Sequence, residues 1–95
     1  MPAYVIGNIT VTDPSWVEKY VPAVAKLVEQ YGGKYIVNTP EVDVLEGGPA
    51  PSVTVVLEFP TLEQAKKWYD SEDYAPWIKA RKSGSSGDLF LVDGR

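Results

Sequence analysis

The segment from residue 53 to residue 69 constrains the fold most strongly, because a strand pattern runs into a helix pattern with almost no linker. Alternate positions from 53 to 59 are apolar and share one face by the two-residue period of a strand, while Val56 adds an apolar residue to the other face. Pro60 ends the strand because it cannot donate to the ladder, and Thr61 with Gln64 fits a capping box that begins a helix. A strand that is apolar on both faces is typical of the centre of a sheet that is covered twice.

Length and charge limit the class of protein. The 95 residues predict one domain, residues 1–95, with little stability to spare. A hydrophobic content of 44% and a charged content of 23% are typical of a soluble globular protein. The net charge of -4 and the lack of basic runs argue against a nucleic-acid partner. The chain has no membrane-spanning pattern and begins without a signal-peptide pattern, so we expect a cytoplasmic protein without a membrane partner.

The absence of cysteine and histidine removes several kinds of chemistry. Disulfides, thiolate catalysis and the commonest metal ligands are excluded, so we expect no metal site and no cofactor. Acid–base chemistry would fall to carboxylates, tyrosines or lysines. The cluster of Asp70, Glu72 and Asp73 lacks the spacing of a calcium loop and is better explained by helix capping.

The first half of the chain predicts a strand, a helix and an edge strand. Residues 4–11 alternate as a strand, and Asp13-Pro14 begins a helix whose apolar stripe ends at Gly32-Gly33. Residues 34–37 and 42–45 are short β-branched runs separated by a segment containing Pro40. They form either one long bulged strand or a strand with an irregular extension, in both cases at a sheet edge.

The second half predicts a helix over residues 62–69, a break, and a shorter helix that ends near Arg81. Residues 83–87 are rich in serine and glycine and are expected to form a flexible loop before a last strand over residues 89–92. The resulting order βαββαβ, with right-handed crossovers, predicts an α+β, ferredoxin-like domain with an antiparallel sheet of order 4-1-3-2 and the helices on one face.

The other face of this sheet would expose an apolar patch of a size that monomers rarely tolerate. A second copy packed sheet to sheet would cover that patch. We therefore expect a homodimer that forms through the sheet face.

Eight short stretches, spread over almost the whole chain, resemble the domain-of-unknown-function family 1330 (DUF1330). They are Tyr4-Val5-Ile6, Val11-Thr12-Asp13-Pro14, Tyr31-Gly32-Gly33-Lys34-Tyr35, Leu45-Glu46-Gly47, Val56-Leu57-Glu58-Phe59-Pro60, Ala65-Lys66-Lys67-Trp68-Tyr69, Ser71-Glu72-Asp73-Tyr74 and Leu91-Val92-Asp93-Gly94. The resemblance implies a dimeric α+β barrel. The wider superfamily includes cofactor-free monooxygenases, haem-degrading enzymes, polyketide cyclases and plain binding or stress proteins, so the fold alone assigns no reaction.

The chain departs from the pattern of that family at three positions. Asn38, Val53 and Asp88 stand where arginine is frequent, whereas Arg81 is present. The resemblance therefore implies a ligand with less charge than those of relatives, or no ligand.

The resemblance also implies a small-molecule site between the sheet and the helices. The polar and aromatic residues that we expect to bind a ligand there are Asn8, Glu58, Trp68, Tyr74 and Arg81, with Tyr4 and Tyr20 behind them. Each has a structural alternative: a paired core amide for the asparagine, an ion pair for the glutamate, and ordinary core packing for the aromatic residues. Burial would raise the pKa of the glutamate and a nearby Arg81 would lower it.

Two functional hypotheses follow. The first is a small-molecule-binding or structural domain with an apolar pocket. The second is a cofactor-free enzyme, monooxygenase-like or cyclase-like, that acts on an aromatic or polyketide-like substrate. In that case Glu58, Tyr74 or Tyr20 would transfer protons and Trp68 would orient the ring. A filled space between the layers favours the first hypothesis, and an open cleft that Glu58 and a tyrosine face favours the second.

Overall fold

The computed structural model describes residues 2–94, which contain four strands, three α-helices and one short 3-10 helix. In chain order the elements are β1 (Ala3–Val11), η1 (Pro14–Trp16), α1 (Val17–Gln30), β2 (Lys34–Thr39), β3 (Val53–Phe59), α2 (Leu62–Tyr69), α3 (Ala75–Ser83) and β4 (Ser85–Asp93). No helix in this part of the chain is long and apolar enough to cross a membrane.

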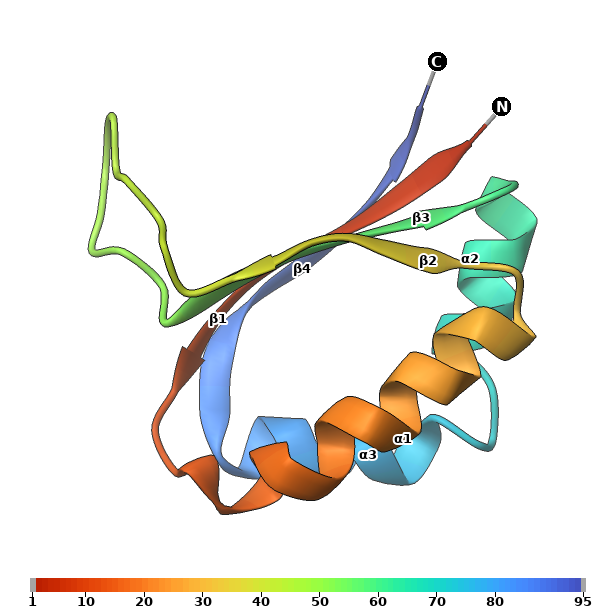
Figure 1. The fold of residues 1–95 in the computed structure, drawn as a ribbon, viewed down its shortest axis with the longest axis horizontal. Coiled ribbons are helices and arrows are strands. Elements are labelled where there is room, and N and C mark those ends of the chain that lie inside the picture. Colours follow the sequence, from red (N-terminus) through yellow and green to blue (C-terminus); the bar gives the residue numbers. More distant parts are fainter. Residues whose placement is uncertain (1, 95) are drawn as a thin grey trace.

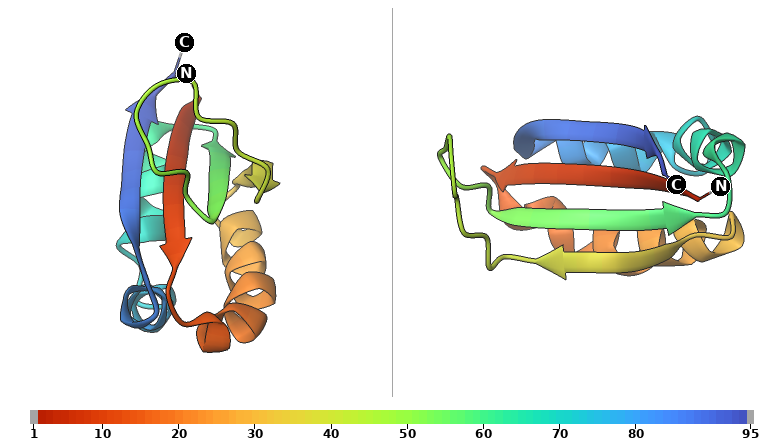
Figure 2. Two further views of the ribbon diagram at one scale, coloured as in Figure 1. Left: turned by 90° about the vertical axis from the view of Figure 1, so that its left-hand side faces the viewer. Right: turned by 90° about the horizontal axis from the view of Figure 1, so that it is seen from above.

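The strands form one antiparallel sheet of order β2-β3-β1-β4, which confirms the order predicted from the sequence. All three α-helices lie on one face of this sheet, and seen from above the four strands lie uncovered in front of them (Figures 1 and 2). The domain therefore has two layers, with one sheet face packed on helices and one sheet face open.

The register decides which side chains face the helices. Val5 of β1 is opposite Leu57 of β3 and Leu91 of β4, so these three residues share the helix-covered face. Their neighbours, such as Ile6 opposite Val56, point to the open face because side chains alternate along a strand. The two-sided apolar pattern of β3 is thus explained by a core on one side and an open surface on the other.

Local signals fix the beginnings of two helical segments. The Thr61 hydroxyl accepts a hydrogen bond from the Gln64 amide at 3.1 Å, as the sequence predicts. The Gln64 side chain does not complete the capping box but donates to the Tyr31 carbonyl at 2.9 Å. The Ser71 hydroxyl accepts from the Tyr74 amide at 3.2 Å and so caps the turn that leads into α3. These bonds tie α2 to the end of α1 and orient Tyr74.

The expected flexible loop over residues 83–87 is wrong, because α3 ends at Ser83 and β4 begins two residues later. Ser85 pairs with Val11, and Gly87 pairs with Ile9 at φ 143°, against the carbonyl of Asn8. Only glycine adopts this backbone easily and leaves room for the neighbouring strand. The serines and glycines therefore begin the strand rather than delay it.

The region between β2 and β3 follows the second of the two predicted alternatives. The edge strand ends at Thr39, its register shifts between Tyr35 and Val37, and residues 42–45 form no strand. The segment over residues 40–52 extends away from the body of the domain (Figure 1). Leu45 on this segment is 93% exposed, which is unusual for a large apolar side chain.

Candidate functional site

A cavity of about 260 Å³ lies between the helix-covered face of the sheet and α1, with Trp68 and Tyr74 contributing to its wall. Its lining is mostly aliphatic, including Val5, Ile9, Val11, Val17, Val21, Val24, Val53, Val55, Leu57 and Leu89. Gly7 lines the cavity from the centre of the sheet, and the side chain of Leu89 lies where a Cβ atom at this position would be. The cavity therefore lies between the two layers of the domain and opens to solvent beside Val21, which is 45% exposed.

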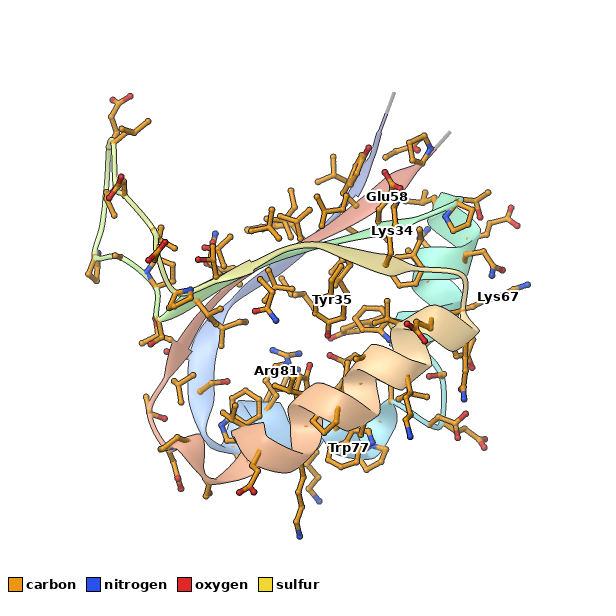
Figure 3. The ribbon with its side chains drawn as sticks, viewed as in Figure 1. Lys34, Tyr35, Glu58, Lys67, Trp77 and Arg81 are labelled. Carbon is orange, nitrogen blue, oxygen red and sulfur yellow. The ribbon has the colours of Figure 1, made fainter. Side chains whose placement is uncertain are left out.

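Arg81 is the one charged residue among those that line the cavity. It comes from α3 and points into the space between the helices and the sheet, while Tyr35 points toward the same space from β2 (Figure 3). Arg81 is only 9% exposed, and no carboxylate of residues 2–94 lies within ion-pair distance of it. Buried charges are normally paired, so a buried guanidinium without a carboxylate partner is a notable departure.

Two tyrosine hydroxyls meet beside this guanidinium. The hydroxyl oxygens of Tyr20 on α1 and Tyr74 before α3 lie 2.5 Å apart and share a hydrogen bond. Burial, and then Tyr74, raise the pKa of Tyr20 far above its usual value. Burial also raises the pKa of Tyr74, although Tyr20 and Arg81 oppose this shift. Both phenols are therefore neutral at physiological pH and act as hydrogen-bonding groups rather than as bases.

The pKa values of Tyr35 and Arg81 are also shifted by their surroundings. Burial raises the pKa of Tyr35 to about 12, so a third neutral hydroxyl borders the cavity. Burial alone would lower the pKa of Arg81, but Tyr74 and Tyr20 raise it by more. The guanidinium stays charged, as arginine does throughout the ordinary pH range.

Trp68 forms the aromatic end of the cavity. It is 1% exposed and stacks on Tyr74, with ring centroids 4.5 Å apart and an angle of 23° between the rings. Phe59 also packs against Trp68, with ring centroids 5.4 Å apart. The Nε1 atom of Trp68 is buried and has no acceptor within the described part of the chain. The expected pocket role and the expected core role of Trp68 are thus compatible.

Asn8 and Glu58 do not lie in the cavity, and the prediction that they converge there with Arg81 is wrong. Asn8 is opposite Thr54 on the open face and accepts a hydrogen bond from its hydroxyl at 2.9 Å. Glu58 lies on the same open face, where Lys34 pairs with it at 3.2 Å (Figure 3). Tyr4, which pairs with Glu58 across the strands, also belongs to that face. Strand alternation is the physical reason, because the core side of β1 and β3 is taken by the odd-numbered residues.

Trp68, Tyr74, Arg81 and Tyr20 are brought together, as expected, around one cavity. Sequence reasoning missed Tyr35 and Asn38 as lining residues. Tyr35 pairs with Leu57 and Asn38 pairs with Val55, so both lie on the helix-covered face. Asn38 does so because the bulge between Tyr35 and Val37 shifts the phase of β2 by one residue, and a bulge cannot be positioned from such a short pattern. No group of three or more Asp, Glu, His or Cys side chains within residues 2–94 is close enough to hold a metal ion.

A four-stranded antiparallel sheet, three helices on one of its faces and a pocket between the layers define a ferredoxin-like α+β domain. The profile of the family described as "Domain of unknown function (DUF1330)" matches residues 2–95, and the chain therefore belongs to that family. A search of curated proteins finds no significant match.

Solved structures agree on the fold. The RPA0582 protein of unknown function from Rhodopseudomonas palustris superposes with a TM-score of 0.81 at 14% identity, over 99% of this chain and 82% of that chain. SnoaB, a cofactor-independent oxygenase from Streptomyces nogalater, superposes with a TM-score of 0.71 at 14% identity, over 99% and 93% of the two chains. An antibiotic biosynthesis monooxygenase gives a TM-score of 0.55 at 17% identity, over 100% and 99%. At these identities the likeness establishes the fold and assigns no activity.

Proposed function

We propose that the protein binds a small, mainly apolar organic molecule in the cavity between sheet and helices. The observation that supports this function is a cavity of about 260 Å³ whose lining is mostly aliphatic, with a few hydroxyls, two indoles, one amide and one guanidinium. Ligand sites have this composition, with an apolar wall and a few polar groups that orient the ligand. A structural core of the same size would instead be filled, because close packing stabilises the folded state.

The alternative function is a cofactor-free enzyme, and its proton-transfer groups differ from those expected from the sequence. Glu58 is on the open face, and no carboxylate borders the cavity in residues 2–94. The raised pKa values of Tyr20 and Tyr74 suit them to donate hydrogen bonds and not to abstract protons at neutral pH. Tyrosines border the cavity, whereas Glu58 does not. This arrangement favours ligand binding over base catalysis.

A thermal-shift screen of small aromatic and aliphatic molecules tests the binding function. A ligand at 100 times its Kd stabilises the folded state by about 2.7 kcal/mol, which corresponds to an increase in Tm of roughly 11–22 °C in a domain of this size. Val55→Phe fills the cavity from β3 and should abolish the shift, whereas Val44→Phe adds the same volume on the exposed segment and should preserve it. Equal shifts in both variants would contradict the assignment of the site.

We also propose that the open sheet face joins two copies of the chain in a homodimer. Phe90 is 55% exposed on this face, and Ile36 and Val92 are also exposed there. Together with Ile6 and Val56 they extend the apolar surface across all four strands. Such a surface, self-complementary about a two-fold axis, is what an isologous sheet-to-sheet contact requires.

Light scattering at micromolar concentration tests this assembly. The mass should be twice the 10.4 kDa of one chain. Phe90→Glu should give the monomer mass, because it places a charge within the apolar contact, whereas Lys26→Glu on exposed α1 should leave the dimer intact. A monomer mass for the unmodified protein would refute the dimer and leave the binding function untouched.

A further inference from the structure

We propose that the molecule bound in this cavity is a monoanion, an organic carboxylate with an apolar body, whose carboxylate pairs with Arg81. The inference rests on the binding function proposed above and names the chemical class of the ligand.

Three buried side-chain atoms lack a partner in residues 2–94, and all three are N–H donors of residues that border the cavity. They are Nε of Arg81, Nε1 of Trp68 and Nε1 of Trp16. The Trp16 indole lies against Gly84 at the edge of the site, so the first two matter most. An unpaired buried donor costs about 1–3 kcal/mol, and more where the group is charged. The cavity therefore has a surplus of donors that a ligand rich in acceptors would satisfy.

The tyrosines add to this surplus. Of the two hydroxyl hydrogens of Tyr20 and Tyr74, only one is used in the bond that joins them, so the pair has one hydrogen left to donate. Arginine has donors only and no acceptor. With no carboxylate among the lining residues, the site carries one net positive charge. A ligand with one negative charge neutralises it, and a cationic ligand is disfavoured.

The charge of the lining residues limits the charge of the ligand to one. Asn38 and Val53 also border the cavity and are neutral, so Arg81 has no second cation beside it there. A monoanion would therefore be fully paired, whereas a phosphate ester or dicarboxylate would leave charge unpaired.

The volume of the cavity limits the size of the apolar part of the ligand. An enclosed apolar cavity of about 150 Å³ holds one benzene ring. At about 260 Å³ this cavity has room for one ring with a short chain. The stacked Trp68 and Tyr74 provide a flat aromatic wall for that ring.

Three probes that share one body test the proposal: 3-phenylpropanoate, its neutral amide 3-phenylpropanamide, and the cationic 3-phenylpropan-1-amine. Isothermal titration calorimetry at pH 7 should give a Kd for the carboxylate about 10- to 100-fold lower than for the amide, as a hydrogen bond to a charged group provides. The amine should bind weakest. Equal affinities for all three would overturn the anion proposal and leave the binding function standing, whereas no binding of any probe would overturn both.

Substitutions at position 81 separate charge from shape. Arg81→Met keeps the length of the side chain and removes the charge, so the carboxylate and the amide should then bind equally. It should fold, because replacing a buried unpaired charge by an apolar side chain is tolerated or stabilising. Arg81→Lys should retain part of the preference, and Lys79→Met, which removes an exposed cation from the same helix, should retain all of it. A preference that survives Arg81→Met would refute the role of the guanidinium.

Discussion

The hydrogen bond between Tyr20 and Tyr74 joins α1 to the start of α3 across 54 residues of sequence. Its contribution to stability can therefore be tested by substituting each tyrosine. Tyr20→Phe removes one hydroxyl and leaves the hydroxyl hydrogen of Tyr74, a residue only 1% exposed, without an acceptor, because the neighbouring Arg81 only donates. A buried hydroxyl without a partner costs about 1–3 kcal/mol. We therefore expect Tyr20→Phe to lower the free energy of unfolding by this amount, out of the roughly 5–15 kcal/mol typical of a domain.

The reverse substitution should cost less. Tyr74→Phe leaves the hydroxyl of Tyr20, which is partly exposed and borders the cavity, where it can find another partner. The expected cost is about 0.5–1.5 kcal/mol, the net value of an ordinary hydrogen bond. The double variant removes both hydroxyls and leaves no unpaired group, so its cost should be smaller than the sum of the two by about 1 kcal/mol.

Urea denaturation followed by circular dichroism measures these differences, at one protein concentration because dimerisation would make stability depend on it. Tyr31→Phe is the matched control, since its hydroxyl makes no side-chain hydrogen bond within residues 2–94, and it should change stability by less than about 0.5 kcal/mol. If the two single variants add to within about 0.3 kcal/mol of the double, the hydroxyls are not coupled and the reasoning fails.

Three further predictions concern stability. Gly87→Ala should cost about 1–3 kcal/mol more than Gly47→Ala by chemical denaturation, because both have positive φ but only Gly87 lies against the carbonyl of Asn8; equal costs would contradict the steric argument. Thr61→Ala should cost about 1 kcal/mol through loss of the cap, whereas Thr61→Ser should cost little. The pKa of Tyr35 is raised to about 12, so the contribution of this phenol to the free energy of unfolding is complete below pH 10 and is lost as the pH rises from 10 to 12. A free energy of unfolding that stays constant across that range would refute this prediction.

Most of the fold was predictable because local signals and alternation agree. Pro60 and Thr61 specify where β3 ends and α2 begins, and the resulting order of elements leaves few topologies for the sheet. The start of β4 was not predictable from composition, since glycine and serine are poor strand formers. Gly87 belongs to a strand only because β1 lies against it, and that contact is not visible in a local pattern.

The site was only half predictable, for two different reasons. Asn8 and Glu58 could have been excluded from the sequence, because both fall out of phase with the apolar residues that face the core. Along β1 and β3 the two-residue period decides which face a side chain takes, whatever its chemical character. By contrast, the contact of Tyr20 with Tyr74 joins two helical faces from distant parts of the chain. No spacing in the sequence encodes the depth at which those hydroxyls meet.

Within residues 2–94, buried polar side-chain atoms without a hydrogen-bond partner are confined to residues around one cavity. Thr61, Ser71 and Gln64 each pair with backbone groups at helix ends, and Asn8 pairs across the open face. The buried donors without partners in residues 2–94 all belong to residues around a single cavity. Sequences depart from local consistency mainly at functional sites, because a group that waits for a ligand lowers stability until the ligand binds. A leucine or methionine at position 81 would remove that cost, so the unpaired cation is best explained by what it binds.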